Sequence, residues 1–371
     1  MKIGIVADGP KISGSMKYIL QLYSRIRKKE KTSLLHLAYE GRLDLKGLDV
    51  EELKPIKLPF FSYFFNFGIY YPIKTCFKSL SNSFDIIHFS RHYPFFILWH
   101  KILTKKKIVI TSHDLWKLNH RYLLFLTKIL KRVDKIITVS NATKKELVDL
   151  GLNEENIEVI YHGVDKTIFK PIGRDKAFNL LTKTKLHDKV KILKNASKIF
   201  LSVSNDTERK NTSRVYEAFS KYLKKDDKAL LVRVVSATNK KIIESQTKRF
   251  SSNVLFLQGL SEEEISLMYN ISDLFVFPSI CEGFGMPLLE SISCGTPCVT
   301  SNFQPMTEVV GESGILVDPY DVDSIYQGLI LCLKNRDVLS KKSLKRAELF
   351  SLDKTFLKTY EVYKDLQQAT K

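Results

Sequence analysis

The sequence predicts an α/β protein with two doubly wound, Rossmann-like domains in tandem. Three observations support this fold class: short runs rich in Ile and Val alternate with helical patterns, the alternation occurs twice, and 371 residues exceed one ordinary hydrophobic core. Runs that are apolar on both faces suit parallel sheets covered by helices. Ligands of such sheets bind beyond the carboxyl ends of the strands, so we expect a cleft between two facing domains.

The first half of the chain contains the first series of strands and helices. Its predicted strands are "KIGIVAD" (2–8), "SLLHLAY" (33–39), "FDIIHFS" (84–90), "KIVITSH" (107–113), "KIITVS" (135–140) and "IEVIYH" (157–162). Amphipathic helices are predicted at 16–29 and 141–151. The second helix begins at a capping residue, Ser140 or Asn141, and ends at Gly151.

A second series follows the charged stretch at 170–195. Its predicted strands are "KIFLSVS" (198–204), "ALLVRVVS" (229–236), "NVLFLQG" (253–259), "DLFVFPS" (273–279), "PCVTS" (297–301) and "GILVDP" (314–319). Helical patterns lie between them. We expect an N-terminal domain at 1–165 and a C-terminal domain at 166–350.

Charge and cysteine content restrict the class of protein. The chain has 59 Lys and Arg against 40 Asp and Glu, a net charge of +19, which suits either anionic partners or solvated lysine faces. Five scattered cysteines without a CxxC pair argue against disulfides and a metal site, and for a reducing compartment. The N-terminus is typical of a buried strand, and no apolar run reaches the roughly 18 residues of a membrane span. We expect a cytoplasmic protein, soluble or peripheral to a membrane.

The first loop, "DGPKISGSMK", precedes a predicted helix. Gly9 and Gly14 have the spacing of phosphate-loop glycines, but Ser15 and Met16 stand where Lys-Ser or Lys-Thr is required, and GxGxxG is absent. A helix start still suits an anion, because its free N–H groups and dipole point outward. Gly14 and Ser15 are therefore candidate ligand contacts, and the alternative is a tight turn.

Arg209 and Lys210 follow the first strand of the second domain, in "SVSNDTERKNTSRVYEAF" (202–219). They stand just before a helix that Asn211, Thr212 or Ser213 could cap. Two cations at the carboxyl edge of such a sheet are placed to hold a phosphate or diphosphate. The alternative is a solvated basic turn.

The stretch "SICEGFGMPLLESISCGTP" (279–297) follows a buried strand. Gly283 and Gly285 let the backbone approach a ligand closely, and the helix that follows has Pro287 in its first turn and Gly295 at its end. The amides of Phe284, Gly285 and Met286 are expected to point outward from the helix start. Glu282 lies before this turn and Glu290 one turn into the helix.

These groups together fit a nucleoside-diphosphate sugar. Carboxylates accept hydrogen bonds from sugar hydroxyls, whereas amides and cations hold phosphates. A glycoside hydrolase with Glu282 and Glu290 as its acid and base is an alternative, but it does not explain Arg209 and Lys210. A basic nucleic-acid-binding protein is a weaker alternative, because no motif of that class is visible.

At these residues the sequence resembles retaining glycosyltransferases of family four, which have the GT-B fold. "CEGFGMPLLE" resembles the family's Glu-x7-Glu signature, and "SNDTERKNTSRVYEAF" resembles its Arg-Lys-Asn segment. Further similar stretches are 159–171, 255–279 and 308–321 in and near the second domain, and "DGPKISGS", "TSHDL" (111–115) and "ITVSNATKKEL" (137–147) in the first. A GT-B relative of another activity, such as a sugar epimerase or a phosphorylase, is a further alternative.

The resemblance implies a role for each candidate residue. The second domain would bind the nucleotide sugar and the first domain the acceptor, a glycan or a lipid-linked molecule. Glu282, Gly283 and the amides of the turn would hold the transferred sugar and the diphosphate, Glu290 the ribose, and Arg209 with Lys210 the leaving diphosphate. The reaction would retain the anomeric configuration and need neither a metal nor another cofactor.

Two features of the first domain follow from the same resemblance. His113 ends the strand at 107–113 and would contact the transferred sugar or the acceptor; the alternative is a histidine that caps the next helix. The chain end, "FSLDKTFLKTYEVYKDL" (350–366), would form a helix that returns to the first domain, so 351–371 are assigned to it. A hinge near 163–197 would close over the donor and exclude water.

Two basic and aromatic segments suggest a membrane surface as partner. Residues 58–77 are densely aromatic, and residues 101–135 contain ten Lys and Arg against two acidic residues, Asp114 and Asp134. Aromatic side chains beside cations suit an anionic lipid surface, which would place the protein on the inner face of the membrane. The alternative is a core helix followed by a solvated basic face.

Overall fold

The computed structural model describes residues 1–8, 14–37, 50–54, 69–104, 106–115, 118–235 and 253–369. The chain separates into two compact units. Unit 1 consists of Met1–Gly163 and Leu352–Lys371, and unit 2 of Val164–Ser351. Each unit is described by itself below.

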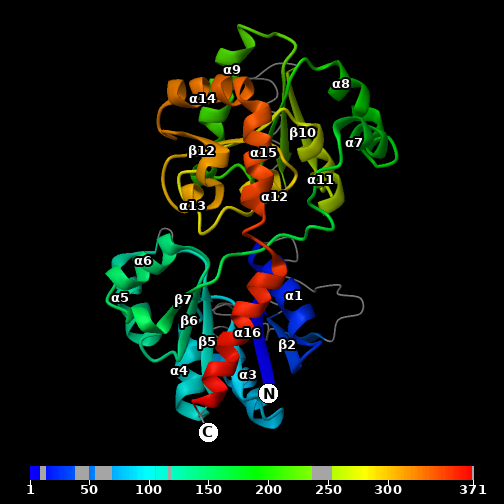
Figure 1. Ribbon diagram of the computed structural model, residues 1–371. Coiled ribbons are helices and arrows are strands. Elements are labelled where there is room, and N and C mark those ends of the chain that lie inside the picture. Colours follow the sequence, from blue (N-terminus) through cyan, green and yellow to red (C-terminus); the bar gives the residue numbers. More distant parts are fainter. Residues whose placement is uncertain are drawn as a thin grey trace, which may run out of the picture. The chain divides into compact units, whose positions relative to one another are not determined.

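Unit 1 contains a parallel sheet of seven strands among the described residues, in the order β3-β2-β1-β4-β5-β6-β7 (Figure 1). The strands are β1 (Lys2–Asp8), β2 (Lys31–Leu37), β3 (Val50–Leu53), β4 (Ile86–Phe89), β5 (Lys107–Ser112), β6 (Lys135–Thr138) and β7 (Ile157–Val159). The helices are α1 (Gly14–Ile26), α3 (Tyr71–Ser81), α4 (Pro94–Leu103), α5 (His120–Leu130), α6 (Asn141–Asp149) and α16 (Leu352–Gln368).

Alternating side chains of the unit 1 strands enter two hydrophobic clusters, one on each face of the sheet. In β1, Ile3 and Ile5 join the cluster under α1 and α16, whereas Val6 joins the cluster under α3, α4 and α5. Figure 1 shows α1 (blue) and α16 (red) side by side on one face. A glycine suits position 4, because a Cβ there would lie only 2.7 Å from the Phe84 ring. Both faces are therefore apolar, as the sequence predicts for a covered parallel sheet.

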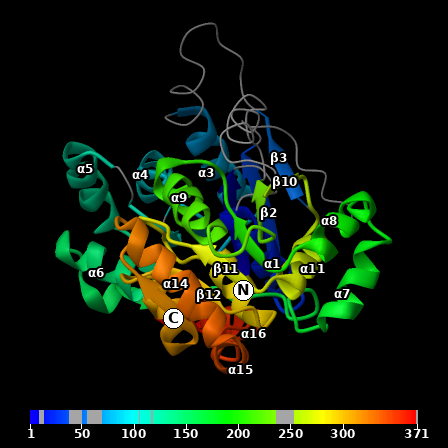
Figure 2. The ribbon, with the colours of Figure 1, turned by 90° about the horizontal axis from the view of Figure 1, so that it is seen from above.

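Unit 2 contains a parallel sheet of six strands among the described residues, in the order β10-β9-β8-β11-β12-β13. The strands are β8 (Ile199–Val203), β9 (Leu230–Val235), β10 (Val254–Gln258), β11 (Leu274–Phe277), β12 (Cys298–Ser301) and β13 (Gly314–Val317). The α-helices are α7 (Arg174–Leu181), α8 (Val190–Asn195), α9 (Thr212–Leu223), α11 (Glu262–Ile271), α12 (Met286–Ser293), α13 (Met306–Val310), α14 (Val322–Lys334) and α15 (Arg336–Ala347). Side chains of α9 and α14 form one hydrophobic cluster with the sheet, and Figure 2 shows α7 beside α11.

The predicted fold class is confirmed, because every predicted strand is present and both sheets are parallel. Strand β1 has its predicted bounds and β2 begins two residues earlier than predicted, whereas the other predicted strands are one to three residues shorter at one or both of their described ends. Strand β3 was not predicted, since "VEEL" is short and half acidic and resembles a loop. Ser140 caps α6 as predicted, with its hydroxyl 3.1 Å from the amide of Thr143.

The C-terminal helix α16 packs on unit 1. Tyr363 on its buried face approaches His88 of β4, with the hydroxyl 2.5 Å from Nδ1. Arg25 of α1 pairs with Asp353 at 3.2 Å, and the Tyr360 hydroxyl donates to Glu30. No helix among the described residues has the length and apolar character that crossing a membrane requires.

Candidate functional site

Lys210 and Glu282 form an ion pair at the carboxyl edge of the unit 2 sheet. Lys210 ends the short 3-10 helix η5 (Glu208–Lys210) after β8, and Glu282 lies in the turn after β11. Because β8 and β11 are neighbours, the loops that follow them meet. The distance from Nζ to Oε1 is 2.5 Å, and the two side chains are only 13% and 8% exposed. The sequence predicted both residues as site residues but did not predict that they pair.

Ser279 connects the two loops that carry this pair. Its hydroxyl lies 2.7 Å from Glu282 Oε1 and 2.8 Å from the carbonyl of Arg209. The amide of Ile280 donates to the same Arg209 carbonyl at 2.7 Å. The backbone of Arg209 is therefore fixed to the turn beyond β11, with its side chain half-buried. The sequence did not single out Ser279, because its role depends on the order of strands in the sheet.

Asn211 does not cap helix α9, although the sequence predicted it as one of three possible caps. It precedes α9 with a left-handed φ of 55°, and its side chain does not cap the helix. Instead its amide nitrogen donates to the carbonyls of Pro278, at 2.9 Å, and Pro319, at 2.6 Å. The helix start thus lacks a capping side chain, and the buried amide joins the loops after β8, β11 and β13.

The predicted glycine turn leads into α12 as expected. Gly285 immediately precedes the helix with φ at 98°, a conformation that L residues other than glycine rarely adopt. No side chain caps the start of α12, so the amides of this first turn have no side-chain acceptor. Phe284 is buried with its ring 5.9 Å from that of Phe350, so it offers a ligand its backbone alone. Gly283 is also buried, and Met286 is partly exposed.

Glu290 lies in α12 with 8% of its surface exposed. Its Oε2 accepts a hydrogen bond from the hydroxyl of Tyr269, in α11, at 3.2 Å. Burial, and then the negative charge of Glu290, raise the pKa of Tyr269 well above its usual value, so the tyrosine remains a donor. The sequence predicted Glu290 and missed Tyr269, which lies in a pattern typical of a core helix.

The predicted residues of the first loop are only partly described. Gly14 and Ser15 form the first residues of α1, but the Ser15 side chain and residues 9–13 lie outside the described part of the chain. His113 follows β5 and is half-buried. Its Nε2 lies 3.1 Å from the Ser90 carbonyl, an arrangement in which Nε2 carries the proton and donates.

His113 belongs to a group of rings at the carboxyl edge of the unit 1 sheet. Its ring stacks on that of His162 with centroids 5.4 Å apart, and Tyr18 lies edge-on at 5.9 Å. Burial, with a contribution from His162, lowers the pKa of His113 well below its usual value, so the imidazole is neutral near pH 7. A neutral imidazole can exchange hydrogen bonds with hydroxyls without adding charge.

Three other histidines lie near this edge, and the sequence assigned none of them a role. His88 bridges Tyr363 and Thr111, with 2.8 Å from its Nε2 to the threonine hydroxyl. His92 Nε2 lies 2.8 Å from the Ser112 hydroxyl. Burial lowers the pKa of His88 and His162 to about 3 and that of His92 to about 4. Their positions near the ends of predicted strands were the only feature of the sequence that could have indicated a place at this edge.

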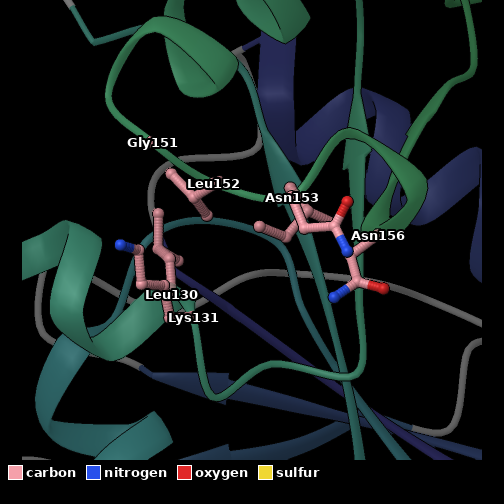
Figure 3. A pocket seen from close by; sticks show the side chains of 7 residues that line it. Leu130, Lys131, Gly151, Leu152, Asn153 and Asn156 are labelled. Atoms are coloured by element: carbon pink, nitrogen blue, oxygen red, sulfur yellow. The ribbon is translucent and has the colours of Figure 1, made fainter.

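A cavity of about 160 Å³ lies at the opposite, amino edge of the unit 1 sheet (Figure 3). Figure 3 shows apolar and amide side chains around it, with Lys131 at one side. Its lining residues are Leu130, Lys131, Ile136, Gly151, Leu152, Asn153 and Asn156. None of the predicted site residues lines it. Among the described residues no three His, Cys, Asp or Glu side chains are grouped as metal ligands would be, and none of the five cysteines forms a disulfide.

Comparisons with known families match both units. Residues 12–167 match the family described as "Glycosyltransferase Family 4", and residues 182–348 match "Glycosyl transferases group 1". The chain is 36% identical over 114 residues to O-antigen chain mannosyltransferase B of Escherichia coli, which is 30% of each chain. It is 27% identical over 282 residues to the MMP alpha-(1->4)-mannosyltransferase of Mycolicibacterium hassiacum, covering 71% of this chain and 63% of the relative. The chain thus spans less than two thirds of the length of these relatives.

A solved structure shares the fold of the whole chain. HepE of Anabaena, solved in complex with UDP and glucose, superposes with a TM-score of 0.82 at 17% identity, over 98% of this chain and 99% of that one. The two parallel sheets and the two family matches agree with each other. The chain therefore has the GT-B fold, and it matches two families of glycosyltransferases, Family 4 over residues 12–167 and group 1 over residues 182–348.

Proposed function

We propose that the protein is a retaining, metal-independent glycosyltransferase. It moves a sugar from a nucleoside-diphosphate sugar to a hydroxyl of a glycan or lipid-linked acceptor. The observation that supports this most is the Lys210–Glu282 pair, which puts a diphosphate-binding cation and a sugar-binding carboxylate 2.5 Å apart. Both stand within the part of the chain that matches the group 1 family.

In the proposed complex, unit 2 binds the donor. The diphosphate lies against Lys210, Arg209 and the amides at the start of α12, from Gly283 to Met286, because a helix start and cations both favour an anion. Lys210 then exchanges Glu282 for a phosphate oxygen, which leaves the carboxylate to accept hydrogen bonds from the transferred sugar. Glu290 accepts hydrogen bonds from the ribose hydroxyls while it keeps the hydroxyl of Tyr269.

The proposed chemistry needs charge stabilisation more than proton transfer. As the sugar–phosphate bond breaks, the two bonding electrons go to the diphosphate, and Lys210 and the α12 amides stabilise that charge. The sugar becomes oxocarbenium-like, the acceptor oxygen attacks the face that the diphosphate leaves, and a phosphate oxygen takes the acceptor's proton. Bond formation on the departed face retains the anomeric configuration. No step requires a metal ion, so chelation should leave turnover unchanged.

Unit 1 is proposed to bind the acceptor. His113, neutral and at the carboxyl edge of its sheet, is proposed to contact the transferred sugar or the acceptor hydroxyl. Gly14 and Ser15, which start α1, are proposed to contact the donor through the N–H groups of the helix start. The relatives named as mannosyltransferases and the UDP-bound HepE support a hexosyl donor and a glycan acceptor.

A panel of nucleotide sugars tests the proposal. A ligand that binds the native state alone raises the Tm, so the matching donor should raise it and the other donors should not. The matching donor is then incubated with candidate glycan and lipid-linked acceptors, with and without a chelator. A glycosylated product of unchanged anomeric configuration is expected. Free sugar as the only product, from an oligosaccharide as well as from the donor, would support a glycoside hydrolase instead.

We also propose that the enzyme lies on the inner face of the membrane and binds its anionic lipids through α4 and α5. On α5, Arg121, Leu124, Phe125 and Lys128 are exposed at a spacing that puts them on one face. Leu124 is 50% and Phe125 39% exposed, flanked by the two cations. Aromatic and aliphatic side chains between cations suit the interface of an anionic bilayer, such as a cytoplasmic leaflet.

Helix α4 continues the same apolar surface. Phe95 contacts Phe125 of α5, with ring centroids 6.1 Å apart, and Ile102 and Leu103 are 65% and 45% exposed. In the predicted aromatic segment at 58–77, residues 58–68 lie outside the described residues, and Ile69 and Phe77 of the rest are exposed. The predicted segment at 101–135 includes Ile102 and Leu103, whereas Phe95 precedes it and was not part of the sequence prediction.

Liposome flotation tests the membrane proposal. Wild-type protein should float with anionic vesicles and not with zwitterionic ones, and the double variant Leu124→Ser/Phe125→Ser should float less. Leu331→Ser is the matched control, since Leu331 is 47% exposed on α14 of unit 2. Equal flotation of the double variant and the control, or none with anionic lipid, would contradict the proposal.

A further inference from the structure

We infer that Arg233, with Asp206, is a positioning residue that sets the loop bearing Arg209 and Lys210 for a diphosphate. This inference rests on the proposed function. Arg233 lies in β9, where "LLVRVV" is otherwise apolar, and it is 0% exposed. It does not touch the Lys210–Glu282 pair in any contact among the described residues. Its effect must therefore pass through the loop.

The guanidinium group of Arg233 binds the loop at its beginning. Nη2 lies 2.9 Å from Asp206 Oδ1 and 3.2 Å from the Ser204 carbonyl. Nη1 donates to the hydroxyls of Ser202, at 2.5 Å, and Ser204, at 3.1 Å. These acceptors all belong to the end of β8 and the first residues after it. The planar fork of an arginine can hold several such acceptors at once, which a lysine cannot.

The register of the sheet explains why Arg233 reaches this loop. Ser202 of β8 is the direct neighbour of Arg233 across the parallel pair. The side chain therefore extends along the last residues of β8 toward the carboxyl edge, where Asp206 meets it. The Tyr216 ring of α9 covers the guanidinium at 5.9 Å. Arg233 is thus enclosed by β8, the loop and α9.

The buried Arg233–Asp206 pair is better explained by its effect on the position of the loop than by a contribution to the stability of the fold. A buried ion pair loses its hydration, and apolar residues of similar volume often stabilise a fold as well or better. Asp206 and Arg233 have side chains 6% and 0% exposed. The other residues of β9 are apolar, so Arg233 is the exception in this strand. What an apolar residue would not supply is the set of hydrogen bonds that fixes Ser204 and Asp206.

The other end of the loop is fixed separately. Asn211 donates to the carbonyls of Pro278 and Pro319, and the Arg209 carbonyl accepts from Ile280. The segment from Ser204 to Asn211 is thus held at its start by Arg233 and at its end by Asn211, with Arg209 and Lys210 before the second anchor. Cations held in place before the reaction stabilise a developing charge most effectively.

The test compares a nucleoside diphosphate with its nucleoside. The probes are UDP with uridine and GDP with guanosine, and the pair that binds wild-type protein is used. In Arg233→Lys, which keeps the charge and loses the fork, diphosphate affinity should fall about 10–100-fold, the effect of losing one charge-assisted hydrogen bond to the phosphates. Nucleoside affinity should change by less than about twofold, because Arg233 fixes only the phosphate-binding loop. With the matching donor, kcat should fall with diphosphate affinity.

Arg174→Lys is the matched control. Arg174 pairs with the buried Asp273 at 2.9 Å in the same unit, and Asp273 also accepts from the amide of Ile199 at the amino end of β8. This variant should lower the Tm without changing the ratio of diphosphate to nucleoside affinity. If Arg233→Lys does not fold, the double variant Arg233→Met/Asp206→Leu removes both charges, and the same loss of diphosphate affinity is expected.

Two results would overturn the inference, and they are distinguishable. Wild-type protein that binds neither of these nucleotides nor any other nucleoside diphosphate would contradict the proposed function and this inference with it. Wild-type binding together with an unchanged affinity ratio in the folded Arg233 variant would contradict the positioning role alone. A lower Tm with an unchanged ratio would assign Arg233 to stability only.

Discussion

At the scale of single residues, the site consists of charges that already have partners. Glu282 is paired with Lys210, and Glu290 accepts from Tyr269. A buried charge without a partner is costly, so a site without its ligand keeps its charges in pairs. Under the proposed function, ligand binding replaces the Lys210–Glu282 pair by a pair of Lys210 and a phosphate oxygen.

Glu290 provides a residue-scale prediction about donor affinity. If Glu290 accepts hydrogen bonds from the ribose hydroxyls as proposed, Glu290→Ala removes charge-assisted bonds that contribute roughly 1.5–3 kcal/mol, so nucleotide Kd should rise about 10–100-fold. Titration calorimetry with the nucleoside diphosphate measures this. Tyr269→Phe, which removes only the hydroxyl that supports Glu290, should have a smaller effect. An unchanged Kd in Glu290→Ala would reject the ribose assignment.

The residues that sequence reasoning found and missed differ in a physical way. Glu282, Glu290, Arg209 and Lys210 stand in short local patterns that follow predicted strands, so their place at a sheet edge could be inferred. In contrast, Arg233 acts across the β8–β9 pair, and Tyr269 acts from α11 on α12. Such contacts depend on strand order and helix packing, which local spacing does not contain.

At the scale of elements, the same distinction applies. Apolar runs predicted the buried strands, since each must be covered on both faces. The short acidic β3 was missed because its pairing with β2, and not its own composition, makes it a strand. Asn211, one of the three predicted caps, immediately precedes α9, but its side chain donates to the carbonyls of Pro278 and Pro319 and does not cap the helix.

Helix α16 provides a prediction at this scale. Tyr363→Phe removes the hydroxyl that lies 2.5 Å from Nδ1 of His88 and leaves a buried nitrogen without that partner. The free energy of unfolding should fall by about 1–3 kcal/mol, the cost of one unsatisfied buried group. Urea denaturation measures it, with Tyr320→Phe, at a position 59% exposed, as the control. Equal free energies of unfolding for Tyr363→Phe and Tyr320→Phe would show that the contact between Tyr363 and His88 does not stabilise the packing of α16.

At the scale of the whole molecule, buried histidines predict how stability depends on pH. Burial lowers the pKa of His88 and His162 to about 3 and that of His92 and His100 to about 4. The unfolded chain, with ordinary histidine pKa values near 6.5, binds more protons between these values. Above about pH 7 these histidines should therefore not change the free energy of unfolding with pH. As the pH drops through 6.5 toward 4, they should lower the free energy of unfolding.

Urea midpoints measured from pH 8 to pH 5 test this prediction. Each buried histidine should cost roughly 1–2 kcal/mol by pH 5, so the midpoint should fall. His162→Asn should make the fall shallower, whereas His187→Asn, at an exposed position, should leave it unchanged. A midpoint that stays constant from pH 8 to pH 5 would contradict the neutral, buried state of these rings.

The central claim is that unit 2 uses Lys210 to stabilise a leaving diphosphate, and turnover of the nucleotide sugar tests it most directly. Release of nucleoside diphosphate in the presence of acceptor is compared among wild-type protein, Lys210→Ala and the control Lys221→Ala, whose lysine forms an exposed pair with Asp323 at 2.6 Å. Loss of a preorganised cation should lower kcat about 10²–10³-fold in Lys210→Ala, and Lys221→Ala should turn over normally. A near-normal kcat in Lys210→Ala would remove Lys210 from the mechanism and contradict the account.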